Sequence, residues 1–410
     1  MKNEQNAPKI RFKGFTDAWE QRKFSDIAET RRGLTYKPTN TANNGVRVLR
    51  SSNINEDTFV FGNEDVFVDE NAVNIPFVQN GDILITSANG SSRLVGKHTI
   101  IRNLPNSSAV HGGFMLIASC SNPDFLNASL GSQWYSEFLS LYVAGGNGAI
   151  GNLNKNDLDA QVILVPSTDE QRQIGTYFRN LDHLITLHQR KCETLQKLKK
   201  SMLQKMFPKN GSYFPEIRFA GFTDAWELRK LHDLFTERNE QYPTSNDYPL
   251  MAFIANVGVA SKGERYDRSA LVKDEEGKKY KRTEKGDFIY SSNNLETGSI
   301  GLNNYGNACI SPVYSVFKSK HNADADFLGR ILLRKEFIHQ MVQYRQGVVY
   351  GQWRIHESDF LNLGICVPPL AEQRQIGAYF RTLDHLITLH QRKLETLKKL
   401  KKAMLQKMFI

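Results

Sequence analysis

The sequence predicts an α+β protein in which two similar globular domains are each followed by a long α-helix, the two helices pairing as an antiparallel coiled-coil spacer with pseudo-two-fold symmetry. Three observations support this prediction. The 410-residue chain repeats itself at an interval of about half its length. Its two most similar segments have the apolar periodicity of helices, and the segments between them alternate short apolar runs with polar turns.

Length and composition bound the class of protein. The residues are 40% hydrophobic and 23% charged, which is typical of a globular chain with room for two domains. No apolar run approaches the ~20 residues needed to cross a bilayer, and the polar first residues do not resemble a signal peptide. We therefore expect a cytoplasmic protein without a membrane partner.

The repeats define the domain boundaries. The sequence PKIRFKGFTDAWE at residues 8–20 returns as PEIRFAGFTDAWE at residues 215–227, an offset of 207 residues. Residues 169–207 return as residues 371–409 with 33 of 39 positions identical, at an offset of 202. One structural unit is therefore expected twice. The predicted boundaries are 1–168 and 208–370 for the globular domains, and 169–207 and 371–410 for the helices.

Between the repeated ends, the two globular domains share only a skeleton. The sequence NGDIL at residues 80–84 corresponds to KGDFI at residues 285–289, an offset of 205. Each indicates a short apolar strand after a Gly-Asp turn, followed by a polar loop rich in Ser, Asn and Gly. Because loops carry specificity while the framework carries stability, one framework with two sets of loops indicates two versions of one recognition task.

The two repeated segments predict helices that pair with each other. From Glu170 to Met206 there is no proline and a single glycine, and apolar residues recur at heptad positions. Such a long helix with one apolar stripe needs a partner, and an approximate two-fold axis between the repeats would make the pairing antiparallel. The alternative is that each helix packs on its own domain. The expected seam residues are Leu181, Leu184, Leu195, Leu198, Met202, Leu383, Leu386, Leu397, Leu400 and Met404.

The net charge of +10 suggests a polyanionic partner, and it is concentrated on the two helical segments. Residues 169–209 contain nine Lys or Arg against four Asp or Glu, and residues 371–410 contain nine against three, which leaves the rest nearly neutral. We expect the helix lysines to form a solvated face that suits the C-terminal dipole, with contact to phosphate as the alternative. These lysines are Lys197, Lys199, Lys200, Lys398, Lys399, Lys401 and Lys402.

No metal or disulfide site is predicted. His188 and His390 occupy matching seam positions, but no second ligand follows at metal-binding spacing. They are expected to be core or register residues. The cysteines have no paired spacing, and we expect them to be reduced core residues. They are Cys120, Cys192, Cys309 and Cys366.

Several fragments imitate catalytic signatures but lack the required context. GNGAIG at residues 146–151 has the spacing of a dinucleotide loop, yet NLNKND after it is not a helix start able to hold a pyrophosphate, and no preceding strand-helix unit frames it. Residues 90–97 have one residue too many for a phosphate loop, and NIPF at residues 74–77 lacks a proline of the Asn-Pro-Pro-Phe tetrapeptide of adenine methyltransferases. EGK at residues 276–278 is a weak nuclease signal without a counterpart in the first repeat. No catalytic residue is therefore expected.

The repeated motifs resemble those of the specificity subunits of type I restriction-modification systems. The resemblance rests on the Gly-Phe-x-x-x-Trp-Glu openings at residues 14–20 and 221–227, and on the Pro-x-x-x-Glu-Gln-Arg-Gln-Ile junctions at residues 166–174 and 368–376. It covers nearly the whole chain, twice and in the same order. It implies a non-catalytic, DNA-binding subunit with two target recognition domains, one for each half of a bipartite, asymmetric site.

The resemblance also implies the partners. They would be double-stranded DNA, two copies of a modification subunit that methylates adenine, and restriction subunits that translocate and cleave DNA. This chain would bind no cofactor, and S-adenosylmethionine, ATP and Mg would be bound by the partner subunits. Half-sites roughly one helical turn apart would leave about five to seven unread base pairs between them. Two copies of one partner need equivalent surfaces, which fits the near-identity of the helices.

The chemistry and position of polar residues in the loops predict which of them contact DNA. Base recognition needs bidentate donors and acceptors, whereas phosphate contacts need Arg, Lys, Ser, Asn and main-chain amides. An ordinary turn role is the alternative for each residue. The candidates in the first domain are Arg31, Arg32, Ser87, Asn89, Ser91, Ser92, Arg93, Lys97, Asn147 and Asn152. The candidates in the second domain are Arg238, Asn239, Ser291, Ser292, Asn293, Asn294, Arg345, Gln346, Tyr350, Gln352 and Arg354.

The rival function is a coiled-coil adaptor that binds proteins and does not recognise DNA, which the near-neutral globular halves favour slightly. The exchange of polar loops on a kept framework and the family resemblance favour DNA recognition. A third class, a self-sufficient methyltransferase or nuclease, is disfavoured by the missing motifs. An adaptor would show no salt-dependent DNA affinity, whereas an enzyme would modify or cut DNA without an added subunit.

Overall fold

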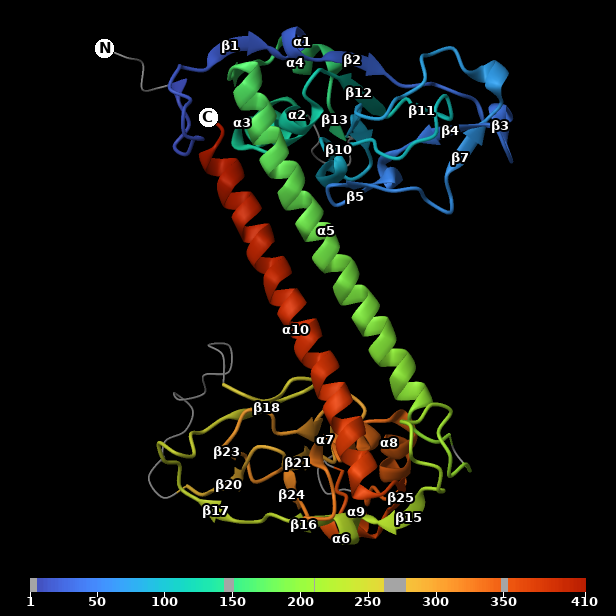
Figure 1. Cartoon of the computed structure of the whole chain (residues 1–410), viewed down its shortest axis with the longest axis vertical. Coiled ribbons are helices and arrows are strands. Elements are labelled where there is room, and N and C mark those ends of the chain that lie inside the picture. The colour runs from blue at the N-terminus through green and yellow to red at the C-terminus, as the bar shows by residue number, and fades with distance from the viewer. Residues whose placement is uncertain (1–5, 144–150, 210, 262–277, 348–352) are drawn as a thin grey trace. The chain divides into compact units, whose positions relative to one another are not determined.

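The computed structural model describes residues 6–143, 151–209, 211–261, 278–347 and 353–410 of the chain. The chain forms two compact units. Unit 1 comprises Met1–Gln189 together with Arg392–Ile410, and unit 2 comprises Arg190–Gln391. Each unit therefore holds one globular domain, the first part of one long helix and the last part of the other (Figure 1).

Unit 1 is built around an antiparallel four-stranded sheet with the order β10-β8-β12-β2. Successive side chains of a strand point to opposite faces, so Ile83 and Ile85 join one apolar cluster while Leu84 joins another. The apolar run predicted to be a strand is therefore buried on both sides. The strands are β2 Glu29–Arg32, β8 Ile83–Thr86, β10 His98–Ile100 and β12 Met115–Ser119.

One face of this sheet is covered by helices. Phe125 of α2 (Pro123–Leu130) and Phe138 of α3 (Gln133–Tyr142) share an apolar cluster with Ile83 and Ile85 of the sheet. Strand β1 (Glu20–Lys23) pairs antiparallel with β14 (Val162–Val165) beside the same cluster. The short helices are α1 Phe24–Ile27 and α4 Lys155–Ala160.

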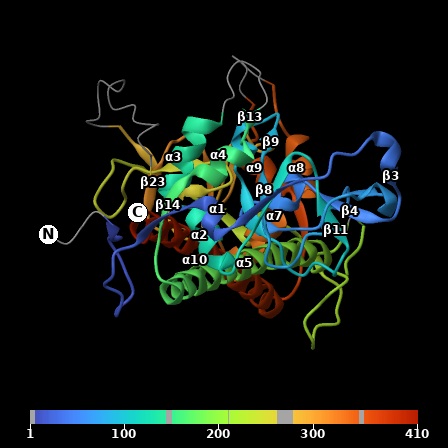
Figure 2. The same cartoon turned by 90° about the horizontal axis from the view of Figure 1, so that it is seen from above.

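The other face of the sheet packs against a second sheet with the order β11-β4-β7-β3. Figures 1 and 2 show β3, β4 and β11 on the side of unit 1 away from α3. Strands β4 and β11 run parallel, and the other pairs are antiparallel. The remaining elements are β3 Thr41–Ala42, β4 Val46–Leu49, β5 Ile54–Asn55, β6 Thr58–Phe59, β7 Val66–Val68, β9 Ala88–Asn89, β11 Ala109–His111, β13 Gly151–Asn152, and the 3-10 turns η2 Pro38–Asn40, η3 Ser51–Asn53, η4 Glu70–Ala72 and η5 Ser92–Leu94.

Unit 2 repeats this plan. Its central antiparallel sheet has the order β16-β24-β21-β22, and it is accompanied by a three-stranded sheet and two strand pairs. The strands are β15 Glu227–Lys230, β16 Phe235–Glu237, β17 Gln241–Tyr242, β18 Ala252–Ile254, β19 Gly258–Ala260, β20 Tyr280–Thr283, β21 Phe288–Tyr290, β22 Ile300–Leu302, β23 Ala308–Ile310, β24 Ser315–Ser319 and β25 Gly364–Val367. The helices of its globular domain are α6 Leu231–Leu234, α7 Ala325–Leu332, α8 Lys335–Val342 and α9 Glu357–Asn362.

The repeated Gly-Asp turn has the same structural role in both units. Gly81 and Gly286 adopt positive φ values of 100° and 89°, a conformation that favours glycine. The carboxylate of Asp82 accepts a hydrogen bond from the main-chain N–H of Gln79 at 2.9 Å, and that of Asp287 accepts one from Glu284 at 2.7 Å. The turn therefore fixes the start of the central strand, which explains why it is shared when the loops are not.

Two 38-residue helices, α5 (Thr168–Lys205) and α10 (Leu370–Lys407), follow the globular domains. In unit 1 the Lys401 ammonium lies 2.8 Å from the Asp182 carboxylate, and in unit 2 Lys199 lies 2.5 Å from Asp384. The two ion pairs are equivalent under the repeat offset of 202, as a two-fold antiparallel pair requires. The predicted α+β class, with two similar domains and an antiparallel helix pair, is confirmed.

The packed stripe of each helix differs from the predicted seam at alternate positions. Of the predicted residues, Leu181, Leu383 and Leu397 are buried, but Leu184, Leu198 and Leu400 are 41%, 37% and 39% exposed. Leu184, three residues after Leu181, and Ile185, four residues after it, are both apolar. In the structure Ile185 takes the packed position. The seam continues through Ile185 and Cys192 in α5. The other predicted residues, Leu195, Met202, Leu386 and Met404, are partly buried.

The start of α5 packs on its own domain as well as on α10. Ile174 and Phe178 of α5 belong to the same cluster in unit 1 as Phe125 of α2 and Met408 and Phe409 from the end of the chain. The two modes of helix packing expected from the sequence therefore occur together. The predicted seam histidines, His188 and His390, are partly buried.

The repeated openings close each unit against the end of a long helix. In unit 1 the Trp19 ring meets the Phe409 ring edge-on with centroids 6.1 Å apart, and Trp226 and Phe207 do the same in unit 2. The main-chain N–H of Ile10 donates to the Lys407 carbonyl at 2.9 Å. The equivalent bond, from Ile217 N–H to the Lys205 carbonyl, is also 2.9 Å long. The opening motif therefore stabilises the fold by attaching the start of each domain to the end of a long helix.

The junction motif is held by the same opening segment. Arg11 binds Glu170 through two hydrogen bonds of 2.7 Å, and Arg218 binds Glu372 at 2.7 and 2.8 Å. Both glutamates are fully buried in the first turn of α5 or α10. Bidentate pairing compensates for the cost of burying the carboxylate, and a negative charge in the first turn also suits the helix dipole.

Candidate nucleic-acid interface

In the first domain, two predicted loops meet at one edge. Asn89 of β9 pairs with Gly151 of β13, Ala88 pairs with Asn152, and the N–H of Leu153 donates to the Ser87 carbonyl at 2.7 Å. The structure therefore brings three predicted residues, Ser87, Asn89 and Asn152, together from segments about 60 residues apart. Asn147 lies outside the described residues.

Exposed cations accompany these loops. Arg32 ends β2, Arg93 lies in η5, and Lys97 precedes β10; all three side chains are exposed. Within the described ranges none of the three has an ion-pair partner, so each is free to meet an anion such as a phosphate. Ser91 and Ser92 are exposed beside Arg93, whereas Ser87 is buried.

Two predicted arginines have a structural role within the chain. The Arg31 guanidinium lies 3.0 Å from Asp82 and 3.3 Å from the Ser119 hydroxyl. At the equivalent place in unit 2, Arg238 is 8% exposed and lies 2.9 Å from Asp287. These guanidinium groups hold the repeated Gly-Asp turn, and their contact with DNA stays a prediction.

A groove of about 590 Å³ opens beside the Asn89 edge of unit 1. Phe114, at the turn between β11 and β12, is 70% exposed on its wall. Arg50 is exposed and, within the described part of the chain, has no ion-pair partner. The Asn89 amide donates to the Ser51 hydroxyl at 3.1 Å across the lining. Concave, largely apolar sites with a few polar groups are typical of ligand recognition.

Sequence reasoning missed Arg50 and Phe114. The groove is assembled from segments that are far apart in the chain, and its backbone layers touch at Gly33 and Gly112, where a Cβ on Gly33 would lie 2.0 Å from the Gly112 carbonyl oxygen. For Phe114 the sequence contains one usable signal, because the preceding Gly112 and Gly113 are typical of a turn and a turn can expose the next side chain. Arg50 had none.

In the second domain, the loop after β21 meets residues from beyond α8. The Arg345 guanidinium donates to the Ser292 carbonyl at 3.0 Å and pairs with Glu296 at 2.9 Å. The Ser292 hydroxyl accepts from the N–H of Ile355 at 3.0 Å, and the Asn293 side chain accepts from the N–H of Trp353 at 2.5 Å. The predicted segments therefore form one surface, although Arg345 itself is occupied structurally.

Among the predicted residues of the second domain, those that remain exposed are Asn239, Asn293, Asn294, Gln346 and Arg354. Ser291 is buried and Ser292 is partly buried. Tyr350 and Gln352 lie outside the described residues. Trp353, which is 46% exposed beside Arg354, was not predicted although a tryptophan in a polar, glycine-containing segment is a recognisable signal.

The helix lysines divide into paired and unpaired groups. Lys199, Lys398, Lys399 and Lys401 each lie in an ion pair. Lys197, Lys200 and Lys402 have no ion-pair partner among the residues described. The paired lysines are neutralised by carboxylates of this chain. They are therefore less available to phosphate than lysines on a solvated helix face would be.

The described residues contain no group of His, Cys, Asp or Glu side chains that could hold a metal ion. Burial raises the pKa of the Cys120 thiol to about 11, so this thiol stays protonated near neutral pH. Burial also lowers the pKa of His111 to about 4, which keeps its imidazole neutral. The methyltransferase-like tetrapeptide is a packing element, because Ile75 and Phe77 lie against an apolar cluster of the second sheet.

Comparison with known proteins identifies the family. Residues 16–197 and residues 223–399 each match the type I restriction modification DNA specificity domain. The chain belongs to the type I restriction-modification specificity family. The subunit is similar to a protein described as the type I restriction enzyme MjaX specificity subunit of Methanocaldococcus jannaschii, with 26% identity over 98% of this chain and 95% of the relative. It is also 27% identical to the EcoKI specificity subunit of Escherichia coli over 37% of this chain and 33% of the relative.

A solved structure has the same fold. The S subunit of a type I restriction-modification system from M. genitalium aligns with a TM-score of 0.62 and 14% identity, covering 98% of this chain and 99% of that one. At this identity the likeness concerns the fold alone. Among the described residues of the specificity subunit, no helix has the length and apolarity of a membrane span.

Family membership confirms the function expected from the sequence. The chain is a DNA-specificity subunit of a type I restriction-modification system and is not an enzyme in its own right. The family assembles with other restriction-modification subunits and with DNA, and it implies no cofactor on this chain.

Proposed function

We propose that each globular domain of this specificity subunit recognises one half of a bipartite, asymmetric site in double-stranded DNA. The observation that carries the proposal is the placement of unlike polar loops at the same point of two equivalent sheets. One loop follows β8 in unit 1 and the other follows β21 in unit 2. Because the frameworks match and the loop residues do not, the two half-sites differ in sequence.

The chemistry of the exposed residues supports a division of labour within the first domain. Arg32, Arg93 and Lys97 are unpaired cations suited to phosphate contacts within the described surface, and they would position the duplex. Arg50 and Phe114 line the groove, where a guanidinium can bind guanine through two hydrogen bonds and an apolar ring can contact a thymine methyl group. In the second domain Arg354, Asn293 and Gln346 would take part in recognition.

The long helices would dock two copies of the modification subunit. Leu187 and Leu389 occupy equivalent positions and are 41% and 52% exposed, and Leu198 and Leu400 form a second equivalent, exposed pair. Exposed apolar residues at matching places on both helices are what two identical partners require. S-adenosylmethionine would be bound by those subunits, ATP and Mg by restriction subunits, and the assembly would act on DNA in the cytoplasm.

The test is a genome-wide map of methylated adenines in cells that express this chain with its modification subunit, compared with cells that lack the chain. We expect a split motif with a fixed unread gap that appears only when the chain is present. Chain-independent methylation, or no methylation by a complex shown to assemble, would contradict the proposal. The latter result would favour a scaffold that does not recognise DNA.

A further inference from the structure

A hairpin of the first domain reaches the end of α10. Strands β5 and β6 are joined by Glu56 and Asp57, and Glu56 has a positive φ of 52°. The Lys398 ammonium lies 3.1 Å from the Glu56 carboxylate, and the Lys401 ammonium lies 2.7 Å from the Asp57 carboxylate. All four residues belong to unit 1.

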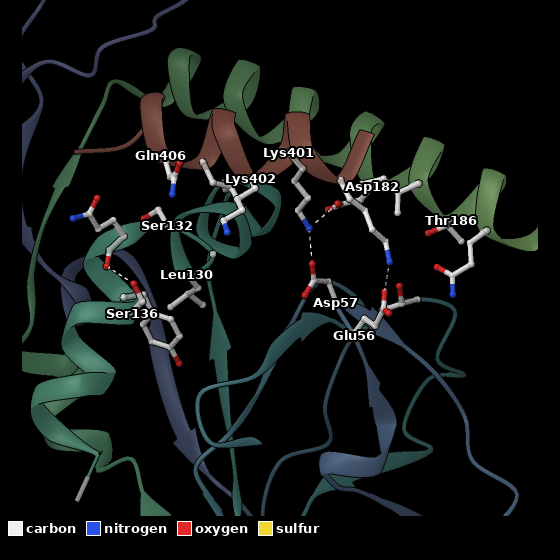
Figure 3. A pocket seen from close by; sticks show the side chains of 18 residues that line it. Glu56, Asp57, Leu130, Ser132, Ser136, Asp182, Thr186, Lys401, Lys402 and Gln406 are labelled. Atoms are coloured by element: carbon white, nitrogen blue, oxygen red, sulfur yellow. Dashed lines mark hydrogen bonds and ion pairs between the residues drawn. The ribbon is translucent and has the colours of Figure 1, made fainter. Parts of the chain in front are cut away.

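Lys401 is the centre of this contact. Its side chain is 15% exposed and also lies 2.8 Å from Asp182 of α5, so one ammonium joins the hairpin to both helices. Figure 3 shows Asp57 and Asp182 converging on Lys401 at the edge of a cavity of about 620 Å³. Burial would raise the pKa of Asp57, but the charge and the hydrogen bond of Lys401, with smaller contributions from neighbouring charges, outweigh burial and lower the pKa. The carboxylate therefore stays ionised when it is bound.

The second copy keeps the counterpart of the Lys401–Asp182 pair, Lys199–Asp384, but lacks both the acidic turn and the counterpart of Lys398. The hairpin β18–β19 corresponds to β5–β6, because β19 contacts β22 as β6 contacts β10 at the same edge of the central sheet. Its turn, residues 255–257, is Ala-Asn-Val and carries no charge. At the place of Lys398, α5 has Gln196, one of only six differences between the repeated helices. An acidic turn thus occurs with lysine at position 398 of α10, and a neutral turn occurs with glutamine at position 196 of α5.

The clamped hairpin is connected to the recognition groove. Asn53 is fully buried just before β5, and its side chain accepts from the N–H of Arg50 at 2.8 Å and donates to the Val60 carbonyl at 3.0 Å. Arg50 and Ser51 line the groove. On the other side, the Thr99 hydroxyl donates to the Asp57 carbonyl at 3.0 Å. Movement of the hairpin turn would therefore be transmitted to Arg50.

We propose that Glu56 and Asp57 with Lys398 and Lys401 form a charge-matched clamp that positions the DNA-recognition groove of the first domain on α10. Lys398 is a positioning residue that adapts one of two nearly identical helices to this domain. The effect on DNA rests on the proposed function, whereas the clamp itself does not. A first domain with a neutral hairpin turn would fit α10 better with glutamine at position 398.

The test uses the full chain in complex with its modification subunit. Lys398→Gln gives α10 the residue of α5, and Glu56→Lys combined with Lys398→Glu reverses the pair. Hydrogen exchange of residues 54–59 reports the clamp. Affinity for a duplex with the mapped target, and for a duplex with the half-site of the first domain scrambled, reports recognition. Lys402→Gln is the matched control, because Lys402 lines the same cavity without an ion pair among the described residues.

We expect Lys398→Gln to increase exchange in residues 54–59 and to weaken binding to the complete target about two- to five-fold, the size expected of a partly exposed ion pair. Binding to the scrambled duplex should not change, and the reversed pair should restore both readouts. Unchanged exchange, equal loss on both duplexes, loss with Lys402→Gln or failure of the reversed pair would overturn the proposal. If the wild-type complex does not discriminate between the duplexes, the proposed function fails. Hydrogen exchange of residues 54–59 alone then tests whether the clamp exists.

Discussion

At the scale of single residues, equivalent arginines have the same structural role in the two domains. Arg31 and Arg238 each bind the aspartate of the Gly-Asp turn. From the sequence both are expected to contact DNA, because arginine is the residue most suited to phosphate and guanine. Their carboxylate partners are not predictable, since Asp82 and Asp287 lie about 50 residues away in the sequence and only the folded sheet brings them close.

Replacing Arg238 with alanine should destabilise unit 2. The change leaves Asp287, which is 2% exposed, without its cationic partner, and breaking a buried pair costs about 3–5 kcal/mol. Urea unfolding monitored by tryptophan fluorescence measures the loss. Arg354→Ala is the contrast: its side chain is exposed, so stability should change by less than about 0.5 kcal/mol. That variant should weaken DNA binding and reduce the salt dependence of affinity by about one phosphate contact. A stable Arg238→Ala variant would contradict the structural assignment.

His111 should make the stability of the first domain depend on pH. Its Nε2 atom lies 3.1 Å from the Arg31 carbonyl, its side chain is buried, and burial lowers its pKa from 6.5 to about 4. Below pH 6.5 the unfolded chain therefore binds more protons than the folded chain, and stability falls as the pH drops towards 4. From pH 6.5 to pH 5 the loss should be about 1.6 kcal/mol. Urea titrations of the wild type and His111→Gln at both pH values check this, and an equal loss in both would rule out His111 as the cause.

At the scale of elements, the two long helices were predictable and their exact packing was not. Their length and apolar period follow from local sequence, whereas the choice between Leu184 and Ile185 as the residue after Leu181 depends on what the helix packs against. In the structure that choice favours Ile185, and it leaves Leu184 exposed. The exposed leucines are then available to partner subunits.

Alanine at two neighbouring positions of α5 should separate packing from docking. Leu181 is 5% exposed, so Leu181→Ala should cost about 2–5 kcal/mol of unfolding free energy. Leu184→Ala should cost less than about 1 kcal/mol, because its side chain is 41% exposed. Chemical unfolding gives both values. Equal losses of unfolding free energy in the two variants would support the seam predicted from the sequence, with both leucines packed.

At the scale of the whole molecule, most of the predicted features follow from the duplicated sequence. It identified two frameworks, two helices and the polar loops after β8 and β21. It could not identify the groove around Arg50 and Phe114, because those residues come from segments that differ between the copies and are joined only by folding. Specific recognition surfaces are, for the same reason, the part of such a chain that repeats least.

Exchange of residues 28–165 for the matching segment of another specificity subunit should change one half-site of the methylated motif and leave the other half-site unchanged. The physical reason is that the loops of each domain are supported by a separate core. Sequencing of methylated adenines in cells with the hybrid chain gives the result. A change in both half-sites would show that the two domains do not recognise DNA independently.

The closure of each unit by an aromatic pair has a consequence for connectivity. Phe207 and Trp226 are 19 residues apart in the sequence, whereas Trp19 and Phe409 meet with the same geometry at a separation of 390 residues. The hydrogen bonds beside the two pairs are equivalent as well. Packing rather than the connecting peptide therefore holds each opening segment on its helix end. A circular permutant that links Phe409 to Pro8 and is cut between Phe207 and Pro215 should keep every contact described within each unit.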